Sequence, residues 1–380
     1  MKKRLIIVAA ALASLMAVSC SKKASTGNVV VEQVYVGDFD NTPVAKNVIL
    51  VIGDGMGLAQ VSASIVLAQE ENSQFYRFPY AGFSRTYSLD NYTTDSGAGG
   101  TAIETGHKVQ NHHLALSPNN RPWPSLFHVL YKSQGKSTGF VVTSSVLDAT
   151  PAASYAHVSD RHMYDQISMQ MAKCHHSVMI GGDKEHFLPA KRKDGKAPLD
   201  TLAARGYELV YSIDSMMNSK SRKLVAIPYM GNPPSAAKRD NFLEKGTRKA
   251  IEILSSNPKG FALLVEGSQI DWAGHNNDTE FMNEELIDFE RTLKVILDFA
   301  EKDGNTLVVV TADHETGGMA LINGNIEKGE NEVRYIHGSH TGVMVPVFAY
   351  GVGAERFTGV MQNTDICNKI LKTCGQSVAE

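Results

Sequence analysis

The feature that most constrains the fold is a series of continuous apolar runs separated by amphipathic stretches. Runs of this kind lie at 47–52, 137–143, 261–265, 305–310 and 345–350. A strand that is buried on both faces has this uninterrupted apolar character. Between the runs, 242–254 and 280–302 place apolar residues three and four positions apart, which is typical of helices. The alternation predicts an α/β fold of three layers, in which helices cover both faces of a mostly parallel central sheet.

The first residues predict export and a lipid anchor. A positive segment, 1–4, precedes an apolar run, 5–18, that is too short to cross a bilayer. Cys20 follows in a context that resembles the lipobox of bacterial lipoproteins, and an ordinary secretory signal with an incidental cysteine is the alternative. We therefore expect the protein in the periplasm or cell envelope, anchored through a lipid on Cys20. The expected divisions are a signal segment over 1–20, a tether over 21–45 and a single domain over 46–380.

Composition allows one large core in this domain and gives no sign of a nucleic-acid partner. The chain has 380 residues, 43% of them apolar, and a net charge of -3. Nucleic-acid binders usually carry a basic face, so this charge balance argues against one. The apolar pattern of the stretch 175–235 is less regular than that of the rest of the domain, and we expect this stretch to form an excursion near the functional site.

Three cysteines follow Cys20, and their spacing does not match a metal site. They are Cys174, Cys367 and Cys374. An oxidising compartment permits disulfides. The last two lie seven residues apart, and on a continuous helix they would be too distant to bond, so a bridge requires a turn between them. The sequence leaves open whether Cys367 and Cys374 are free thiols or form a disulfide.

Carboxylates follow three of the expected strands. They are Asp54, Glu266 and Asp313. Open α/β sheets bind ligands at the carboxyl ends of their strands, so these side chains should meet at one edge. A single aspartate at a strand end is usually a helix cap. Three carboxylates converging in one place would repel one another unless cations lay between them. A metal site therefore accounts better for the set.

Histidines near these carboxylates indicate which metals would bind. Asp271 and His275 are four residues apart, His314 follows Asp313, and His340 lies in a loop before the last strand. Imidazole and carboxylate together suit zinc. An oxygen-only subset suits magnesium, and it comprises Asp54, Thr150 and Glu266.

Ser96 opens a small-residue stretch, 93–102, that reads as a helix start. In the simplest interpretation Asp95 or Ser96 caps the helix and the glycines allow close packing. A serine in this position also lies where main-chain N–H groups and the helix dipole favour phosphate. Serine needs a base or a metal to act as a nucleophile. The chain has no Gly-x-Ser-x-Gly motif, which favours a metal.

These motifs together resemble the bacterial alkaline phosphatases, from about residue 47 to the end of the chain. The matching blocks are Val-Ile-Gly-Asp-Gly-Met-Gly at 51–57, Thr-Asp-Ser-Gly-Ala-Gly-Gly-Thr-Ala at 94–102, Leu-Asp-Ala-Thr-Pro-Ala-Ala at 147–153, Val-Glu-Gly-Ser-Gln-Ile-Asp-Trp-Ala-Gly-His at 265–275, Thr-Ala-Asp-His-Glu-Thr-Gly-Gly at 311–318 and His-Thr-Gly at 340–342. Each block is moderately specific, and their common order makes coincidence implausible. The resemblance implies an alkaline phosphatase-like fold for the domain.

The resemblance also implies two zinc ions, one magnesium ion and a ligand set. One zinc would be held by Asp54, Asp313 and His314, and the other by Asp271, His275 and His340. Magnesium would be held by Asp54, Thr150 and Glu266, with Asp148 orienting its waters. His337 is an alternative to His340 if the register differs, and the Thr-Gly that follows His340 favours the latter.

The implied reaction is the hydrolysis of small phosphate monoesters in two steps. Ser96 would be phosphorylated in the first step, and water would hydrolyse the phosphoserine in the second. Arg161 would bind two phosphate oxygens. The family habit further implies a homodimer and an alkaline pH optimum. Trp272 departs from the lysine of the enterobacterial enzyme, which we interpret as tuning of the site.

Two other functions compete with this interpretation. A phosphodiesterase, or a sulfatase-like enzyme, could use the same metals. Diesterases of this superfamily generally lack the third metal site and the arginine, however, and the Ser96 region has no sulfatase motif. The second alternative is a lipoprotein that binds metal or phosphate without turnover. The intact nucleophile and ligand set argue against it.

Overall fold

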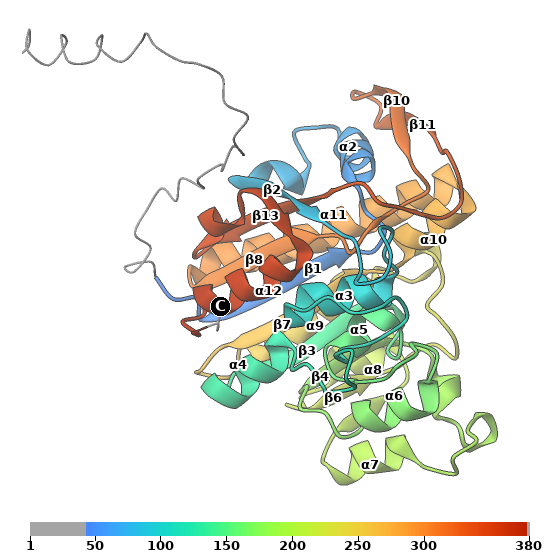
Figure 1. The fold of residues 1–380 in the computed structure, drawn as a ribbon, viewed down its shortest axis with the longest axis vertical. Coiled ribbons are helices and arrows are strands. Elements are labelled where there is room, and N and C mark those ends of the chain that lie inside the picture. Colours follow the sequence, from blue (N-terminus) through green and yellow to red (C-terminus); the bar gives the residue numbers. More distant parts are fainter. Residues whose placement is uncertain (1–42, 378–380) are drawn as a thin grey trace, which may run out of the picture. The chain divides into compact units, whose positions relative to one another are not determined.

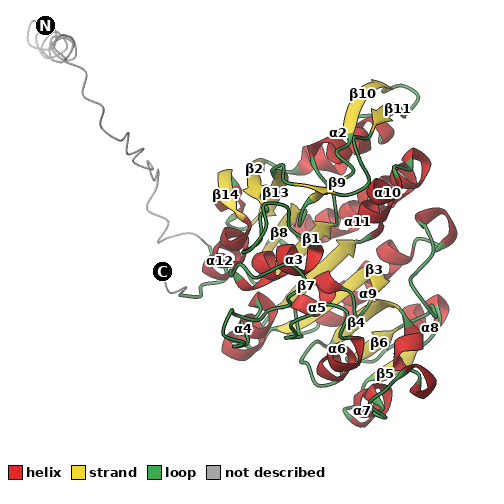
Figure 2. Cartoon of the chain, turned by 45° about the vertical axis from the view of Figure 1, so that its right-hand side comes forward, coloured by secondary structure: helices red, strands yellow, loops and turns green. Residues whose placement is uncertain are grey.

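A computed structural model describes residues 43–377, and the expected signal segment and most of the tether lie outside this range. Its centre is a sheet of ten strands in the order β14-β2-β13-β8-β1-β7-β3-β4-β6-β5 (Figures 1 and 2). The strands are β1 (Asn47–Gly53), β2 (Tyr80–Arg85), β3 (Ser137–Ser145), β4 (Val178–Gly182), β5 (Glu208–Val210), β6 (Leu224–Ala226), β7 (Phe261–Gly267), β8 (Thr306–Thr311), β13 (Val345–Gly351) and β14 (Gly359–Gln362).

Parallel pairing at the middle of the sheet aligns the strand ends that carry carboxylates. Strand β1 pairs in parallel with β7 and β8, and Ile52 lies opposite both Glu266 and Thr311. Because the three strands end at the same level, Asp54, Glu266 and Asp313 meet at one edge. The mostly parallel sheet is confirmed, with β13 as an antiparallel strand between β8 and β2.

Helices cover both faces of the sheet, which confirms the three-layer α/β architecture (Figure 2). Along β1, Val48, Leu50 and Ile52 face one apolar cluster, and Ile49 and Val51 face the other. This alternation follows from the two-residue period of a strand.

The helices divide between these two clusters. The first cluster includes residues of α3 (Ser96–Thr105), α4 (Leu126–Gln134), α5 (Ala149–Ala153), α6 (Tyr164–Met171), α7 (Pro198–Ala204) and α12 (Asn363–Thr373). The second includes residues of α2 (Leu58–Leu67), α8 (Ile213–Asn218), α9 (Phe242–Leu254), α10 (Gln269–Asn276) and α11 (Thr279–Asp303). The helix expected over 242–254 is present with those bounds, and the one expected over 280–302 is confirmed as α11, which extends one residue further at each end.

The stretch 175–235, expected to be an irregular excursion, contributes three strands to the sheet. Strand β4 continues the sheet beyond β3, and β6 and β5 follow in parallel. The three strands have only three to five residues each. So short an apolar run leaves little periodicity to recognise in a sequence.

A buried ion-pair network fixes the segment that leads into α9. The Arg239 guanidinium donates to Glu285 at 2.6 and 2.8 Å and to Asp288 at 2.7 Å, and all three side chains are almost fully buried. Removing the guanidinium would leave buried carboxylates without a counter-charge and would lower the free energy of unfolding by about 3–5 kcal/mol. Arg239 therefore ties the chain before α9 to the long helix α11.

The three cysteines of the domain are free and buried. Helix α12 is continuous through Thr373, so Cys367 and Cys374 lie two turns apart without the turn that a bridge needs. Among the helices of residues 43–377, none combines the length and the apolar character that a membrane span requires.

Two small two-stranded sheets stand apart from the central sheet. Strands β9 (Glu315–Thr316) and β12 (His340–Thr341) pair with each other. Strands β10 (Ala320–Asn325) and β11 (Glu330–Arg334) form an antiparallel hairpin, which projects beyond α2 in Figure 1.

Candidate metal centre and active site

The ends of β1 and β8 bring Asp54, Asp313 and His314 together in a buried group. The His314 Nε2 atom lies 3.2 Å from Asp313 Oδ2 and 3.5 Å from Asp54 Oδ1. One ligand atom from each of the three residues lies within 4.8 Å of the others. This is the set that the sequence predicted for one zinc ion.

The charges in this group lack compensation from the protein. Asp54 Oδ1 and Asp313 Oδ2 are buried and have no hydrogen-bond partner among the described residues. Burial, and then the charges of Asp313 and Asp271, raise the pKa of Asp54 well above its usual value. A cation would remove the repulsion and satisfy both oxygens. The residues therefore fit a bound metal.

Asp271, His275 and His340 form a second group, built from α10 and β12. His275 Nε2 lies 3.3 Å from Asp271 Oδ2, and His340 Nε2 lies 3.5 Å from Asp271 Oδ1. The two Nε2 atoms are 3.1 Å apart. Figure 1 shows α10 at the same end of the sheet as the end of β1. His337, the alternative to His340, instead accepts a hydrogen bond from the Ser339 N–H through its Nδ1 atom.

Main-chain carbonyls set the tautomers of the two histidines in this second group. The Nδ1 atom of His275 lies 3.0 Å from the Gly338 carbonyl oxygen, and that of His340 lies 2.9 Å from the Thr94 carbonyl oxygen. A carbonyl can only accept, so each Nδ1 carries a proton and donates it. Each Nε2 is then left as the ligand atom, which is the usual arrangement around zinc.

Thr316 connects the two groups, and the sequence analysis did not single it out. Its hydroxyl donates to Asp271 Oδ1, and its oxygen lies 3.2 Å from His314 Nδ1. Because the hydroxyl proton goes to the carboxylate, the oxygen accepts from Nδ1–H of His314. The Nε2 atom of His314 therefore faces Asp54 and Asp313 unprotonated. The Asp-His-Glu-Thr block at 313–316 contains this residue, but only the fold reveals its partners.

Ser96 is the first residue of α3 and lies beside the first group. Its Oγ atom is 3.3 Å from His314 Nε2, and the side chain is buried. Asp95 caps the helix by accepting from the Ala98 N–H at 2.9 Å. A Cβ atom on Gly99 would lie 3.0 Å from Asp313 Cβ, so glycine allows α3 to approach the metal group this closely.

Arg161 is held by two carboxylates, one of them on Asp95, the residue that precedes Ser96. One guanidinium nitrogen donates to Asp95 Oδ2 at 3.2 Å, and the other donates to Asp148 Oδ1 at 3.0 Å. The charges of Asp148 and Asp95 outweigh burial and raise the pKa of Arg161. The two carboxylates thus fix a permanent positive charge at the Asp95 cap of α3.

The third predicted site combines Asp54 with Thr150 and Glu266, near Asp148. Thr150 belongs to α5, Glu266 ends β7, and the Thr150 hydroxyl oxygen is buried without a hydrogen-bond partner among the described residues. Burial, and then the charges of Asp148 and Asp313, raise the pKa of Glu266 well above its usual value. The Oε2 atom of Glu266 is buried without a hydrogen-bond partner among residues 43–377. This oxygen-rich surrounding fits a hard cation such as magnesium.

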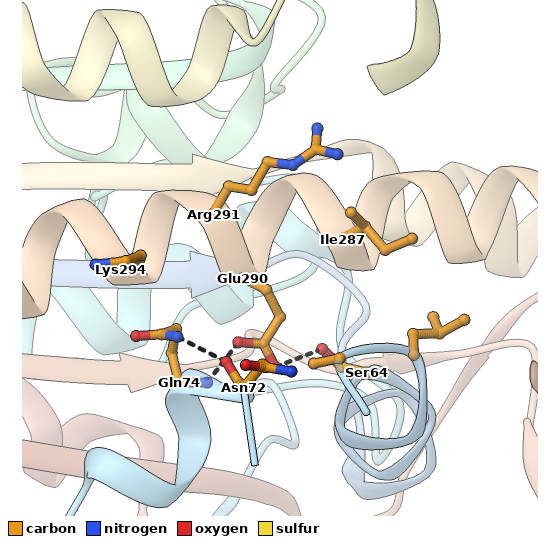
Figure 3. Close-up of a pocket in the computed structure, with 9 residues that line it drawn as sticks. Ser64, Asn72, Gln74, Ile287, Glu290, Arg291 and Lys294 are labelled. Carbon is orange, nitrogen blue, oxygen red and sulfur yellow. Dashed lines mark hydrogen bonds between the residues drawn. The ribbon is translucent and has the colours of Figure 1, made fainter. Parts of the chain in front are cut away.

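A cavity of about 260 Å³ between α2 and α11 shares no residue with these groups (Figure 3). Glu290 points into it, and its carboxylate accepts from Ser64 Oγ at 3.0 Å, Ser73 Oγ at 2.7 Å and the Gln74 N–H at 2.7 Å. The buried charge is already satisfied by these three donors. We therefore place the candidate active site at the metal groups.

Replacing Thr316 should weaken zinc binding without unfolding the protein. Thr316→Val keeps the shape of the side chain and removes the hydroxyl that fixes His314. Loss of such an orienting partner typically weakens metal binding about 10- to 100-fold. Competition with a chromogenic chelator measures the affinity. Thr247→Val, which removes a buried hydroxyl on α9, is the matched control and should bind zinc as the wild type does. Equal affinities for both variants would contradict the role of Thr316.

Zinc binding to the metal-stripped protein should depend on pH through His275. The hydrogen bond to Asp271 raises the pKa of His275 to about 9, so the imidazole is protonated at neutral pH without metal. Zinc must displace that proton, and its affinity should therefore rise with pH, by about tenfold per unit, and level off above about pH 9. Titrations across this range test the slope. His275→Asn should flatten it, and a flat profile in the wild type would refute the prediction.

Comparison with known proteins agrees with this arrangement of residues. The family model for alkaline phosphatase matches residues 45–333. Alkaline phosphatase 4 of Bacillus subtilis is 33% identical over 86% of this chain and 89% of its own length. Alkaline phosphatase of Escherichia coli is 30% identical over 85% of this chain and 84% of its own. The structure of alkaline phosphatase from the Antarctic bacterium TAB5 superposes with a TM-score of 0.82 at 33% identity, covering 89% of this chain and all of that one. The chain belongs to the alkaline phosphatase family.

Proposed function

We propose that this hydrolase cleaves phosphate monoesters through a phosphoserine intermediate on Ser96, with two zinc ions and one magnesium ion bound. Membership of the family supports monoester hydrolysis. The observation that carries the finer proposal is the position of Ser96 Oγ, which lies 3.3 Å from His314 Nε2 at the N-terminus of α3, directly after the Asp95 cap.

The chemistry divides into two displacements at phosphorus. Ser96 Oγ loses its proton and bonds to phosphorus while the bond to the ester oxygen breaks, so the alcohol leaves. Water then attacks the phosphoserine, inorganic phosphate leaves, and Ser96 regains its proton. The N-terminal N–H groups of α3 favour the negative phosphate during both steps.

The proposed metal ligands are supported by the sequence motifs and by the two groups of potential ligand atoms. Asp54, Asp313 and His314 would hold one zinc ion, and Asp271, His275 and His340 the other. Thr150 and Glu266 would join Asp54 on magnesium, with Asp148 near its waters. When bound, the zinc ions supply positive charge that stabilises the reacting oxygens and lowers the pKa of water.

Arg161 would bind the transferred phosphoryl group. Its guanidinium is already oriented by Asp95 and Asp148, so little side-chain entropy is lost when phosphate arrives. Two N–H groups of the fork can grip two non-bridging oxygens at once. The negative charges of Asp95 and Asp148 remain beside it and ease the release of the phosphate product.

The remaining proposals concern the location and assembly of the protein. We place it in the periplasm or cell envelope, anchored through Cys20, because of the residues that precede the domain. Its substrates would be small phosphate monoesters that reach this compartment. A homodimer is proposed from the habit of the family.

Ser96→Ala should abolish most monoesterase activity while zinc remains bound. The methyl group cannot accept phosphate, and loss of a covalent nucleophile commonly lowers kcat by on the order of 10³-fold or more. Turnover of p-nitrophenyl phosphate and metal analysis of the same sample measure both properties. Ser84→Ala, another buried serine, is the matched control and should keep wild-type turnover. Wild-type turnover in Ser96→Ala would exclude this nucleophile.

The preference for monoesters over diesters should distinguish the proposal from a phosphodiesterase. Arg161 and the third cation contribute positive charge that a dianionic monoester uses more fully than a monoanionic diester. We expect kcat/KM for a phenyl monoester to exceed that for its methyl phenyl diester by at least about 10²-fold. A higher value for the diester would reverse the assignment, and no turnover of either ester would favour the binding lipoprotein.

A further inference from the structure

Asp183 stands directly after β4 in a backbone conformation that an aspartate adopts at a cost. Its φ is 79° and its ψ is 49°, in the left-handed region. Glycine adopts this conformation without steric strain, whereas other residues need a compensating interaction. The Asp183 side chain is buried, with 8% of its surface exposed. A buried aspartate in this conformation directs attention to the contacts of its carboxylate.

The contacts of the carboxylate lead to the loop that carries Asp148. Ser145 Oγ donates to Asp183 Oδ2 at 2.7 Å, and the same Oγ accepts from the Leu147 N–H at 3.0 Å. The Asp148 N–H donates to the Ser145 carbonyl at 3.1 Å, which closes a tight turn. The hydroxyl proton of Ser145 is thus committed to Asp183, so its lone pairs remain available to Leu147.

The other side of Asp183 is fixed by two further contacts. The His186 Nδ1 atom lies 2.6 and 2.8 Å from the two carboxylate oxygens, and the Asp183 N–H donates to the Gly231 carbonyl at 2.7 Å. Glu185 completes a possible metal-ligand group with these residues, but it pairs with Lys191 at 3.7 Å. Because the carboxylate oxygens already have donors, we interpret the group as a hydrogen-bonded relay.

We propose that Asp183 is a positioning residue for the third cation site and for Arg161. It acts through the Ser145 hydroxyl on the 145–148 turn, which delivers Asp148 to Arg161 and starts the helix that carries Thr150. This inference rests on the proposed function, since it assigns Asp183 to the site where magnesium would bind. The hydrogen bonds that the Asp183 carboxylate makes to Ser145 and His186 offset the backbone strain at this residue.

Magnesium binding to the zinc-loaded protein tests the proposal directly. Asp183→Gly relieves the backbone strain and removes the acceptor, so the protein should stay folded. We expect its magnesium dissociation constant to rise about tenfold or more in calorimetry, as for other residues that orient metal ligands. Asp183→Asn keeps an oxygen acceptor and tolerates the left-handed region, so it should restore most of the affinity.

Two further variants separate positioning from a general effect on the fold. Asp240→Gly is the matched control, because Asp240 also has a positive φ of 53° but is exposed and pairs with Lys245. It should bind magnesium as the wild type does. Ser145→Ala removes the middle of the relay. In that background, adding Asp183→Gly should weaken binding little further, because both changes break the same chain of contacts.

Kinetics and hydrogen exchange give readouts that a merely structural role would not move. We expect Asp183→Gly to lower kcat at limiting magnesium, and kcat should return to the wild-type value at saturating magnesium. The KM for the monoester should rise, because Arg161 would bind the phosphoryl group less well. The Leu147 amide should exchange faster than in Asp240→Gly.

If the wild type binds no third cation, the proposed function fails at that site, and the exchange rate alone then decides whether Asp183 positions the turn. Wild-type magnesium affinity and wild-type exchange in folded Asp183→Gly would overturn the inference. Should that variant fail to fold, Ser145→Ala gives the same comparison.

Discussion

The repulsion among buried carboxylates at one edge of the sheet is the constraint on which the rest of the structure depends. Asp54, Glu266 and Asp313 are delivered to this edge by three neighbouring parallel strands, and the pKa values of the first two are raised by burial and by the surrounding charges. Two unit charges 4 Å apart repel by about 4 kcal/mol at an effective dielectric constant of about 20. A fold that concentrates several such charges pays a cost that bound cations would offset. The metals in this account therefore stabilise the site as well as serve its chemistry.

The same repulsion bears on Ser96, the proposed nucleophile, because the imidazole beside it is committed to the carboxylates. The imidazole closest to Ser96 is His314, but its Nε2 atom is directed at Asp54 and Asp313 and its Nδ1 atom is engaged by Thr316. Helix α3 approaches this group because Gly99 leaves no side chain in the way. In the proposed mechanism Ser96 therefore depends on the metal ligands for its reactivity, and without a cation it would be only the first residue of a helix.

The sequence predicted the parts of the molecule in which local pattern and chemistry coincide. Long apolar strands such as β1 and β7 have a distinct composition, and the residues after them belong to recognisable blocks. Strands β4, β5 and β6 were missed because three to five residues carry too little periodicity. Thr316 and Asp183 were missed for a different reason. A threonine hydroxyl and an aspartate after a glycine pair are common in any sequence, and their roles arise only from partners far along the chain, Asp271 for the first and Ser145 for the second.

If Ser96 carries the phosphoryl group during turnover, as proposed, the phosphorylated enzyme can be trapped. The zinc-loaded protein would be mixed with a phosphate monoester, quenched in acid within one turnover, digested and analysed by mass spectrometry. The account predicts one phosphate on the peptide that contains Ser96, and none after the metals have been removed by a chelator. Turnover that proceeds with no phosphate on that peptide, or with phosphate on another residue, would contradict it.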